Sequence, residues 1–239
     1  MNPVVTHLIQ QGLAQHRSGH FGAAESSYAS ALSLDPENPD ALHLYGVISH
    51  QQGNHHEAIK RIQRAIERAP QPAFYNSLGE SFRALNETEK AVTAYRCAIE
   101  LSPRYAAAHY NLGLSLASAG NLNDAGASFR QALSLEPRDA QTLNQLGEIS
   151  RRLQRQEEAI EFFRQALAVK PDDAETRANL ANLFIASGET GTALKITRDA
   201  MVMNPPNAQI LHGAAIELVG FLDRDQAAFQ RPVMQGRWS

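Results

Sequence analysis

Six prolines recur along the chain at a nearly constant interval, and this spacing limits the possible fold more than any other feature. Their successive separations are 34, 33, 34, 34 and 34 residues. The prolines are Pro36, Pro70, Pro103, Pro137, Pro171 and Pro205. A fixed period of this length is typical of architectures in which one small structural unit is repeated and stacked on its neighbours. The chain is therefore expected to be an array of units rather than one globule.

Small residues recur in the same register as these prolines. One alanine column comprises Ala31, Ala65, Ala98, Ala132, Ala166 and Ala200. A second, seven residues earlier, comprises Ala24, Ala58, Ala91, Ala125, Ala159 and Ala193. A glycine column comprises Gly12, Gly46, Gly79, Gly113 and Gly147, with Ala181 in the sixth unit. Two helices that cross closely leave no room for a large side chain, so these columns predict helix crossings. Aromatic residues between the alanines, such as Tyr95, are expected to fill the space further out.

Each unit is predicted to contain two helices. The first carries apolar residues at helical spacing, as at Leu112 and Leu116. It is expected to end at a residue that suits a left-handed cap. These residues are Gly19, Gly53, Asn86, Gly120 and Gly188. A single helix pair cannot bury its apolar faces alone, so neighbouring pairs are expected to share one continuous core.

The repeated residues resemble the tetratricopeptide repeat. In the third unit the matching residues are Tyr75, Leu78, Gly79, Phe82, Ala91, Tyr95, Ala98 and Pro103. The sixth unit departs from the pattern at Arg177, Ala181 and Thr197. The resemblance covers residues 5–207 as six units, 5–38, 39–71, 72–105, 106–139, 140–173 and 174–207. It implies an all-α solenoid, a right-handed superhelix of antiparallel helix pairs, and residues 208–239 are expected to add a capping helix and a tail.

The resemblance also implies that the first helices line a concave groove. The groove residues predicted on this basis are His16, His43, Val47, His50, Asn76, Glu80, Arg83, Tyr110, Leu114, Asn144, Glu148, Arg151 and Asn182, with Ile9, Leu13, Ala117, Ala178 and Ile185 between them. Amides on such a face can bond a peptide backbone, and the apolar residues can form pockets.

An adjacent column adds Asn111, Gln145 and Asn179. Asn111 and Asn179 resemble the asparagine ladder in the repeat arm of O-linked N-acetylglucosamine transferase. The whole array resembles a bacterial-type repeat array similar to the arm of such transferase-like proteins. The alternative is that these asparagines bond a neighbouring helix. Glu80 with Arg83, and Glu148 with Arg151, are expected to form (i, i+3) pairs that support their helices.

Histidines are concentrated in the first two units. His43 and His50 are seven residues apart on one helix, a rise of about 10 Å, so they cannot bind the same ion. His55 and His56 are expected to be solvated in a turn. No metal site and no cofactor are predicted; a groove end that responds to pH is an alternative to simple polar surface. The groove also lacks the basic residues of a clamp for chaperone C-termini, with Ile9 and Glu80 among the residues at those sites.

Composition excludes several classes of function. The chain has 22 Lys and Arg against 25 Asp and Glu, a net charge of -3, which gives no electrostatic basis for binding nucleic acid. This charge and the strict spacing also disfavour the related pentatricopeptide repeats, which bind RNA. The lone cysteine, Cys97, excludes a disulfide framework. No apolar run approaches the roughly 18 residues of a membrane span, and the N-terminus lacks the features of a signal peptide, so a cytoplasmic location is expected.

The sequence predicts a non-enzymatic scaffold that binds a peptide segment of a partner protein in the groove. No phosphate-binding loop, zinc-protease helix or serine elbow is present, so no catalytic residue is predicted. Two alternatives stay open: the substrate-recruiting arm of a larger enzyme, such as a glycosyltransferase, and a self-assembling array. The helix expected after Pro206 is apolar on more than one face, which predicts homo-oligomerisation through the C-terminal end.

Overall fold

The computed structural model describes residues 2–203, and every regular element in this range is a helix. The chain divides into two compact units, residues 1–136 and residues 137–239. The first unit contains α1 (Pro3–Arg17), α2 (Phe21–Leu34), α3 (Pro39–Gln51), α4 (His55–Arg68), α5 (Pro72–Ala84), α6 (Thr88–Leu101), α7 (Ala106–Ser118) and α8 (Leu122–Leu135). The described part of the second contains α9 (Ala140–Arg152), α10 (Gln156–Val169), α11 (Ala174–Ala186) and α12 (Thr190–Met203).

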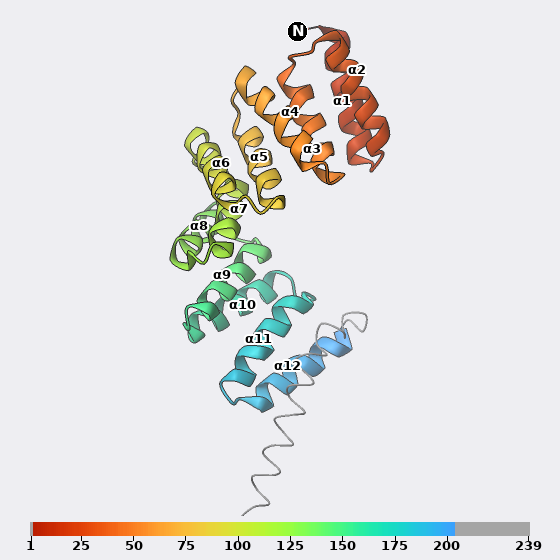
Figure 1. The fold of residues 1–239 in the computed structure, drawn as a ribbon. Helices are drawn as coiled ribbons and strands as arrows, with labels where there is room; N and C mark the ends of the chain where they lie inside the picture. Colours follow the sequence, from red (N-terminus) through yellow and green to blue (C-terminus); the bar gives the residue numbers. More distant parts are fainter. Residues whose placement is uncertain (1, 204–239) are drawn as a thin grey trace, which may run out of the picture. The chain divides into compact units, whose positions relative to one another are not determined.

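The helices pack as consecutive antiparallel pairs, which we number repeats 1 to 6 from α1/α2 to α11/α12 (Figure 1). Within the first unit each pair contacts the next through α2 and α3, α4 and α5, and α6 and α7. In the second unit α10 contacts α11 in the same way. The all-α array of helix pairs predicted from the repeat period is confirmed. The capping helix expected over 208–239 lies outside the described residues.

Short-range signals explain where the helices begin. Pro3 and Pro39 stand in the first turns of α1 and α3, where a missing N–H costs nothing. The side chains of Asn2 and Asn38 accept hydrogen bonds from the backbone N–H groups of Val4 and Ala41. These caps satisfy donors that the helix itself leaves unpaired. None of the described helices is long and apolar enough to cross a bilayer.

The turn inside each helix pair needs one residue with a left-handed backbone. Gly53 supplies it in repeat 2 with φ +83°, and Asn86 supplies it in repeat 3 with φ 60°. The five predicted caps all have positive φ, so that prediction is confirmed. In repeat 5 the position is occupied by Gln154, also at φ 60°, which the sequence pattern did not identify. A glutamine is strained there by about 1–2 kcal/mol, because its Cβ approaches the following carbonyl.

The crossing of the two helices in a repeat is built on the glycine column. A Cβ added to Gly79 would lie 2.5 Å from Cε1 of Tyr95, and one added to Gly147 would lie 2.5 Å from Cε1 of Phe163. The aromatic ring therefore lies directly against the glycine, and the expectation that it fills space further out is wrong. Repeat 6 departs from the pattern at both positions. Alanine, which is larger than glycine, stands at Ala181, and threonine, which is smaller than an aromatic residue, stands at Thr197; both side chains are buried.

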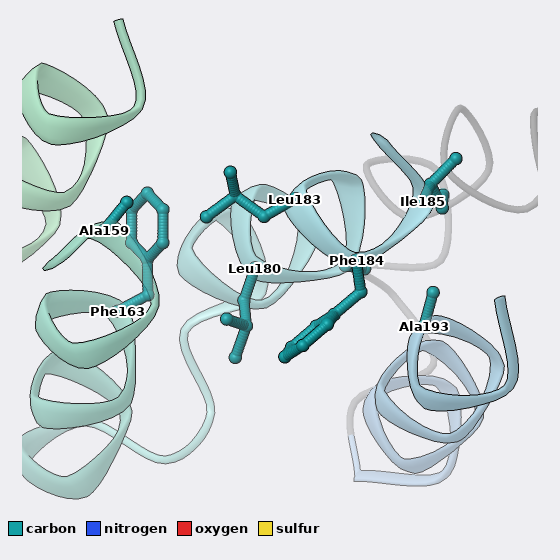
Figure 2. Close-up of a cluster of buried hydrophobic side chains, with 8 residues drawn as sticks. Ala159, Phe163, Leu180, Leu183, Phe184, Ile185 and Ala193 are labelled. Atoms are coloured by element: carbon teal, nitrogen blue, oxygen red, sulfur yellow. The ribbon is translucent and has the colours of Figure 1, made fainter. Parts of the chain in front are cut away.

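Buried side chains from α10, α11 and α12 form one hydrophobic cluster in the second unit. Figure 2 shows Phe163 of α10 and Ala193 of α12 on opposite sides of α11. Helix α11 contributes Leu180, Leu183 and Phe184, and all of these side chains are at most 6% exposed. The apolar face of α11 is thus covered by the helices that precede and follow it, as expected for units that share one core.

Candidate functional site

The first helices of neighbouring repeats lie closer together than the second helices do. Helix α1 contacts α3, α3 contacts α5 and α5 contacts α7 in the first unit, and α9 contacts α11 in the second. Among the described helices, no pair of second helices from neighbouring repeats packs as closely. The face presented by the first helices is therefore the inner face of each unit, and it carries the predicted groove residues.

These residues differ widely in how much of their side chains a ligand could reach. Asn76, Asn111 and Asn144 are buried, at 6%, 9% and 7% exposed. Arg83, Arg151 and Asn182 are exposed. The half-buried members are His16, His43, Val47, His50, Glu80, Tyr110, Leu114, Glu148 and Asn179. The groove assignment stays a prediction, and the exposed and half-buried members are the ones a ligand could contact directly.

In the first unit, buried amides join repeat 3 to repeat 4. The Nδ2 of Asn111 donates to Oδ1 of Asn76 at 3.0 Å and to Oε1 of Glu80 at 3.2 Å. The Nδ2 of Asn76 donates to the same Glu80 oxygen at 3.1 Å. Glu80 accepts both amides through Oε1 and forms no ion pair with Arg83 among the described residues, so the predicted Glu80–Arg83 pair is wrong.

In the second unit, the corresponding residues are arranged differently. The Nδ2 of Asn179 donates to Oδ1 of Asn144 at 3.3 Å. Glu148 accepts from Nε of Arg151 at 2.8 Å and from Nη2 at 2.7 Å, so the predicted (i, i+3) pair is confirmed. The carboxylate raises the pKa of the Arg151 guanidinium further. Asn111 and Asn179 thus each bond a neighbouring helix. This agrees with the alternative in which these asparagines join helices and do not form a ladder for a ligand.

Histidines bridge first helices in the first three repeats. The Nε2 of His16 lies 2.8 Å from Oε1 of Gln51, and the Nε2 of His43 lies 3.0 Å from Oγ of Ser77. The His43 ring also stacks on Phe74, with 4.4 Å between ring centroids. Burial lowers the pKa of His43 to about 4, so this imidazole is neutral at pH 7.

A second histidine contact lies at the turn between α3 and α4. The Nδ1 atoms of His50 and His55 are 3.3 Å apart, and Oγ of Ser81 is 3.3 Å from Nδ1 of His50. Burial, followed by the nearby charges of His55 and Arg83, lowers the pKa of His50. The expectation that His55 is solvated is wrong, because its ring is half-buried against His50, whereas His56 is exposed as expected.

Crevices between helices of the first unit were not anticipated from the repeat pattern. One, between α5 and α6, has a volume of about 390 Å³. It is lined by Tyr75, Leu78, Phe82, Glu89, Lys90, Thr93, Ala94 and Cys97. Three of these lining residues, Tyr75, Leu78 and Phe82, belong to the repeat pattern itself. Such a crevice therefore carries no separate signal in the sequence.

Comparisons with known proteins agree with this architecture. The model of the family described as the cilia and flagella-associated protein 70 C-terminal domain matches residues 2–219. Tetratricopeptide repeat protein 6 of Homo sapiens is 28% identical over 105 residues, 44% of this chain and 20% of that protein. A probable N-acetylglucosaminyltransferase of Hordeum vulgare, SPINDLY, is 29% identical over 120 residues, 46% of this chain and 12% of that protein.

A solved structure is similar over most of its length. The chain TTC0263, described as a thermophilic TPR protein in Thermus thermophilus, is 26% identical and has a TM-score of 0.61. The match covers 75% of this chain and 98% of that chain. By contrast, the matches to the two sequence relatives cover only a fifth and about an eighth of their lengths.

Proposed function

The chain belongs to the tetratricopeptide-repeat family described as the cilia and flagella-associated protein 70 C-terminal domain, and on this premise we propose that it is a non-catalytic scaffold that binds a peptide segment of a partner protein. The fold by itself suggests a protein–protein interaction module. We propose in addition that the partner segment is a peptide and that it lies along the first helices. A cytoplasmic location and self-association remain predictions, and the C-terminal helix that would mediate association lies outside the described residues.

One observation carries the proposal: the first helices lie side by side in each unit and present a continuous row of polar and apolar side chains. Exposed Arg83 and half-buried Val47 and Leu114 belong to this row in the first unit. An extended peptide has backbone groups that need hydrogen-bonding partners and side chains that need pockets. A row that alternates such groups over several helices offers both.

Buried members of the row are poor choices for testing ligand binding. Asn76 and Asn144 each accept a hydrogen bond from the next repeat, so alanine at either position would loosen the contact between repeats. A loss of binding could not then be separated from a change in the scaffold. The exposed residues Arg83, Arg151 and Asn182 avoid this difficulty.

The test combines peptide selection with a matched pair of triple variants. Peptides are selected from a random display library on the full chain, and their dissociation constants are measured by titration calorimetry. The groove variant replaces Arg83, Arg151 and Asn182 by alanine. The control replaces two arginines and one amide on second helices, the exposed residues Arg96, Arg164 and Gln131.

We expect the groove variant to lose on the order of tenfold in affinity, about 1.4 kcal/mol, while the control binds like the wild type. Circular dichroism should show equal helicity in all three proteins. An equal loss in both variants, or a loss confined to the control, would move the binding face away from the first helices and overturn the proposal.

A second candidate is the substrate-recruiting arm of a larger enzyme. It is favoured by the 29% identity to SPINDLY, a probable glycosyltransferase of which this chain covers 12%. A catalytic domain encoded in the same reading frame would support this candidate. In that case the groove would still bind a peptide, and the bound peptide would be a substrate of the attached enzyme.

A further inference from the structure

Two histidine rings meet at the turn of repeat 2. His50 lies in the last turn of α3, and His55 is the first residue of α4. The residues between them form a tight turn in which Gly53 has φ +83°. Backbone hydrogen bonds from Asn54 N to Ser49 O, at 2.8 Å, and from His55 N to Gly53 O, at 2.9 Å, fix this turn. The two rings are therefore held together by local backbone structure.

The separation of the ring nitrogens matches the spacing of two nitrogen ligands on one ion. The Nδ1 atoms are 3.3 Å apart, which is longer than the usual 2.7–3.2 Å of a nitrogen-donor hydrogen bond. Two histidine nitrogens that each lie about 2.0–2.1 Å from one tetrahedral Zn²⁺ are roughly 3.3–3.4 Å apart. An ion between the rings would thus need almost no change in the distance between them.

The hydrogen bonding around His50 leaves its Nδ1 weakly satisfied. The hydroxyl of buried Ser81 donates to the carbonyl of Ser77 at 2.9 Å, so its proton is already used. Its oxygen lies 3.3 Å from Nδ1 of His50, the same long distance as the contact with His55. Both contacts of this nitrogen are therefore long, and neither would be a strong bond for a metal to replace.

We propose that His50 and His55 form a site for a borderline divalent cation such as Zn²⁺, held by the two Nδ1 atoms. Imidazole nitrogen is a preferred ligand of such ions, and it must be neutral to bind them. No group of three or more His, Cys, Asp or Glu residues within residues 2–203 could complete a closed site. The ion therefore keeps open positions that water fills, and its affinity is modest.

One neighbouring charge acts on this site. The Arg83 guanidinium lies close enough to His50 to interact with it electrostatically. The same guanidinium repels a divalent cation. Removing its charge while keeping a polar side chain, as in Arg83→Gln, should therefore tighten metal binding. A site far from Arg83 would show no such response.

The experiment is a titration of the tag-free full chain with Zn²⁺ by calorimetry and with Co²⁺ by visible absorbance. We expect one saturable site at pH 7.5 that weakens at pH 5.5, where protons compete for the imidazoles. His55→Gln should weaken binding by at least about tenfold, because losing a ligand costs no less than losing an outer-shell partner. The His50→Ala/His55→Ala double variant should abolish it.

His56→Ala is the matched control, because His56 is an exposed histidine directly beside the pair in sequence. This control should bind metal like the wild type. The proposal is overturned if the wild type shows no saturable site, or if His55→Gln and the double variant both bind metal with wild-type affinity. Circular dichroism of each variant separates loss of the site from loss of the fold, and His55→Gln keeps the test valid if the double variant unfolds.

Discussion

Repeats 3 and 5 carry the same polar residues in the same register, yet these residues choose different partners. Asn76, Glu80 and Arg83 correspond to Asn144, Glu148 and Arg151, and each set is followed by an asparagine in the next repeat, Asn111 or Asn179. Glu80 accepts the amides of Asn76 and Asn111. Glu148 instead accepts two guanidinium hydrogens of Arg151.

The difference shows that identical side chains at one spacing permit more than one hydrogen-bonding network. A carboxylate oxygen accepts equally well from an amide or a guanidinium, so the outcome depends on which donors come within about 3 Å. Asn111 is within that reach of both Asn76 and Glu80, whereas Asn179 reaches Asn144 at 3.3 Å. The two arrangements therefore differ in which donors bond the carboxylate, amides at Glu80 and a guanidinium at Glu148.

The largest expected effect concerns the buried aromatic ring that each of these two repeats carries. Tyr95→Ala and Phe163→Ala should each lower the free energy of unfolding by about 3–5 kcal/mol, because each removes a fully buried ring that packs on a glycine. Urea denaturation followed by circular dichroism measures the loss. Phe21→Ala is the control: this ring is 42% exposed, and its removal should cost well under about 1 kcal/mol. Comparable losses at Phe21 and at the buried rings would contradict the prediction.

The second prediction concerns repeat 2, where His43 stands in the register of Ser77 and Asn111. The pKa of His43 falls from 6.5 to about 4 on burial, so the unfolded chain takes up a proton more readily than the folded one. The stability from this group is complete above pH 6.5 and declines as the pH falls to 4, by about 3 kcal/mol in total. His43→Asn should make the stability less dependent on pH in this window. The same slope in both proteins between pH 7 and pH 4 would contradict it.

The third prediction separates the two asparagine contacts. Asn111→Ala should destabilise by about 1–3 kcal/mol, because it removes the donor to Oδ1 of buried Asn76 and one of the two amide donors to Glu80. Asn179→Ala should cost about 0.5–1.5 kcal/mol, because Asn179 is half-buried and makes one long bond. Chemical denaturation of both variants gives the difference. Asn182→Ala, at an exposed position, should have almost no effect, and equal costs for Asn111 and Asn179 would refute the distinction.

The smallest expected effects on stability are those of substitutions at Glu148 and Glu80. Glu148→Gln removes an ion pair with Arg151, whose side chain is 46% exposed, and should cost only about 0.2–0.5 kcal/mol at low salt. This cost should shrink in roughly 0.5 M NaCl, because salt screens exposed charges. Glu80→Gln keeps an oxygen that can accept both amides, so its effect should change little with salt. Measurements of unfolding at two salt concentrations test both expectations, and a salt-dependent cost at Glu80 alone would reverse the assignment.

Local features of the molecule were predictable from the sequence. The 34-residue period, the two helices per unit and the left-handed caps depend on residues a few positions apart. Gln154 shows where this reasoning fails, because glutamine has no preference for the left-handed conformation that it adopts. The turn there is imposed by the packed helices on either side of it.

The positions of the polar residues in the candidate site could be predicted from the sequence, but their hydrogen-bond partners could not. The sequence placed the groove residues on the first helices, yet it paired Glu80 with Arg83 and left His55 in solvent. In the structure Glu80 bonds two amides and His55 contacts His50. Residues three or five positions apart are near one another in any helix or tight turn, so spacing alone does not choose among several available donors.

The amino-acid sequence by itself thus determined that this protein is an array of paired helices with a small residue at each crossing, because these properties follow from local backbone preferences and side-chain size repeated in one register. The tertiary structure alone decided which carboxylate accepts an amide, which accepts a guanidinium, and which histidine rings meet. Those choices depend on which donors and acceptors the neighbouring helices bring within bonding distance of one another, and hydrogen bonds are sensitive to that distance.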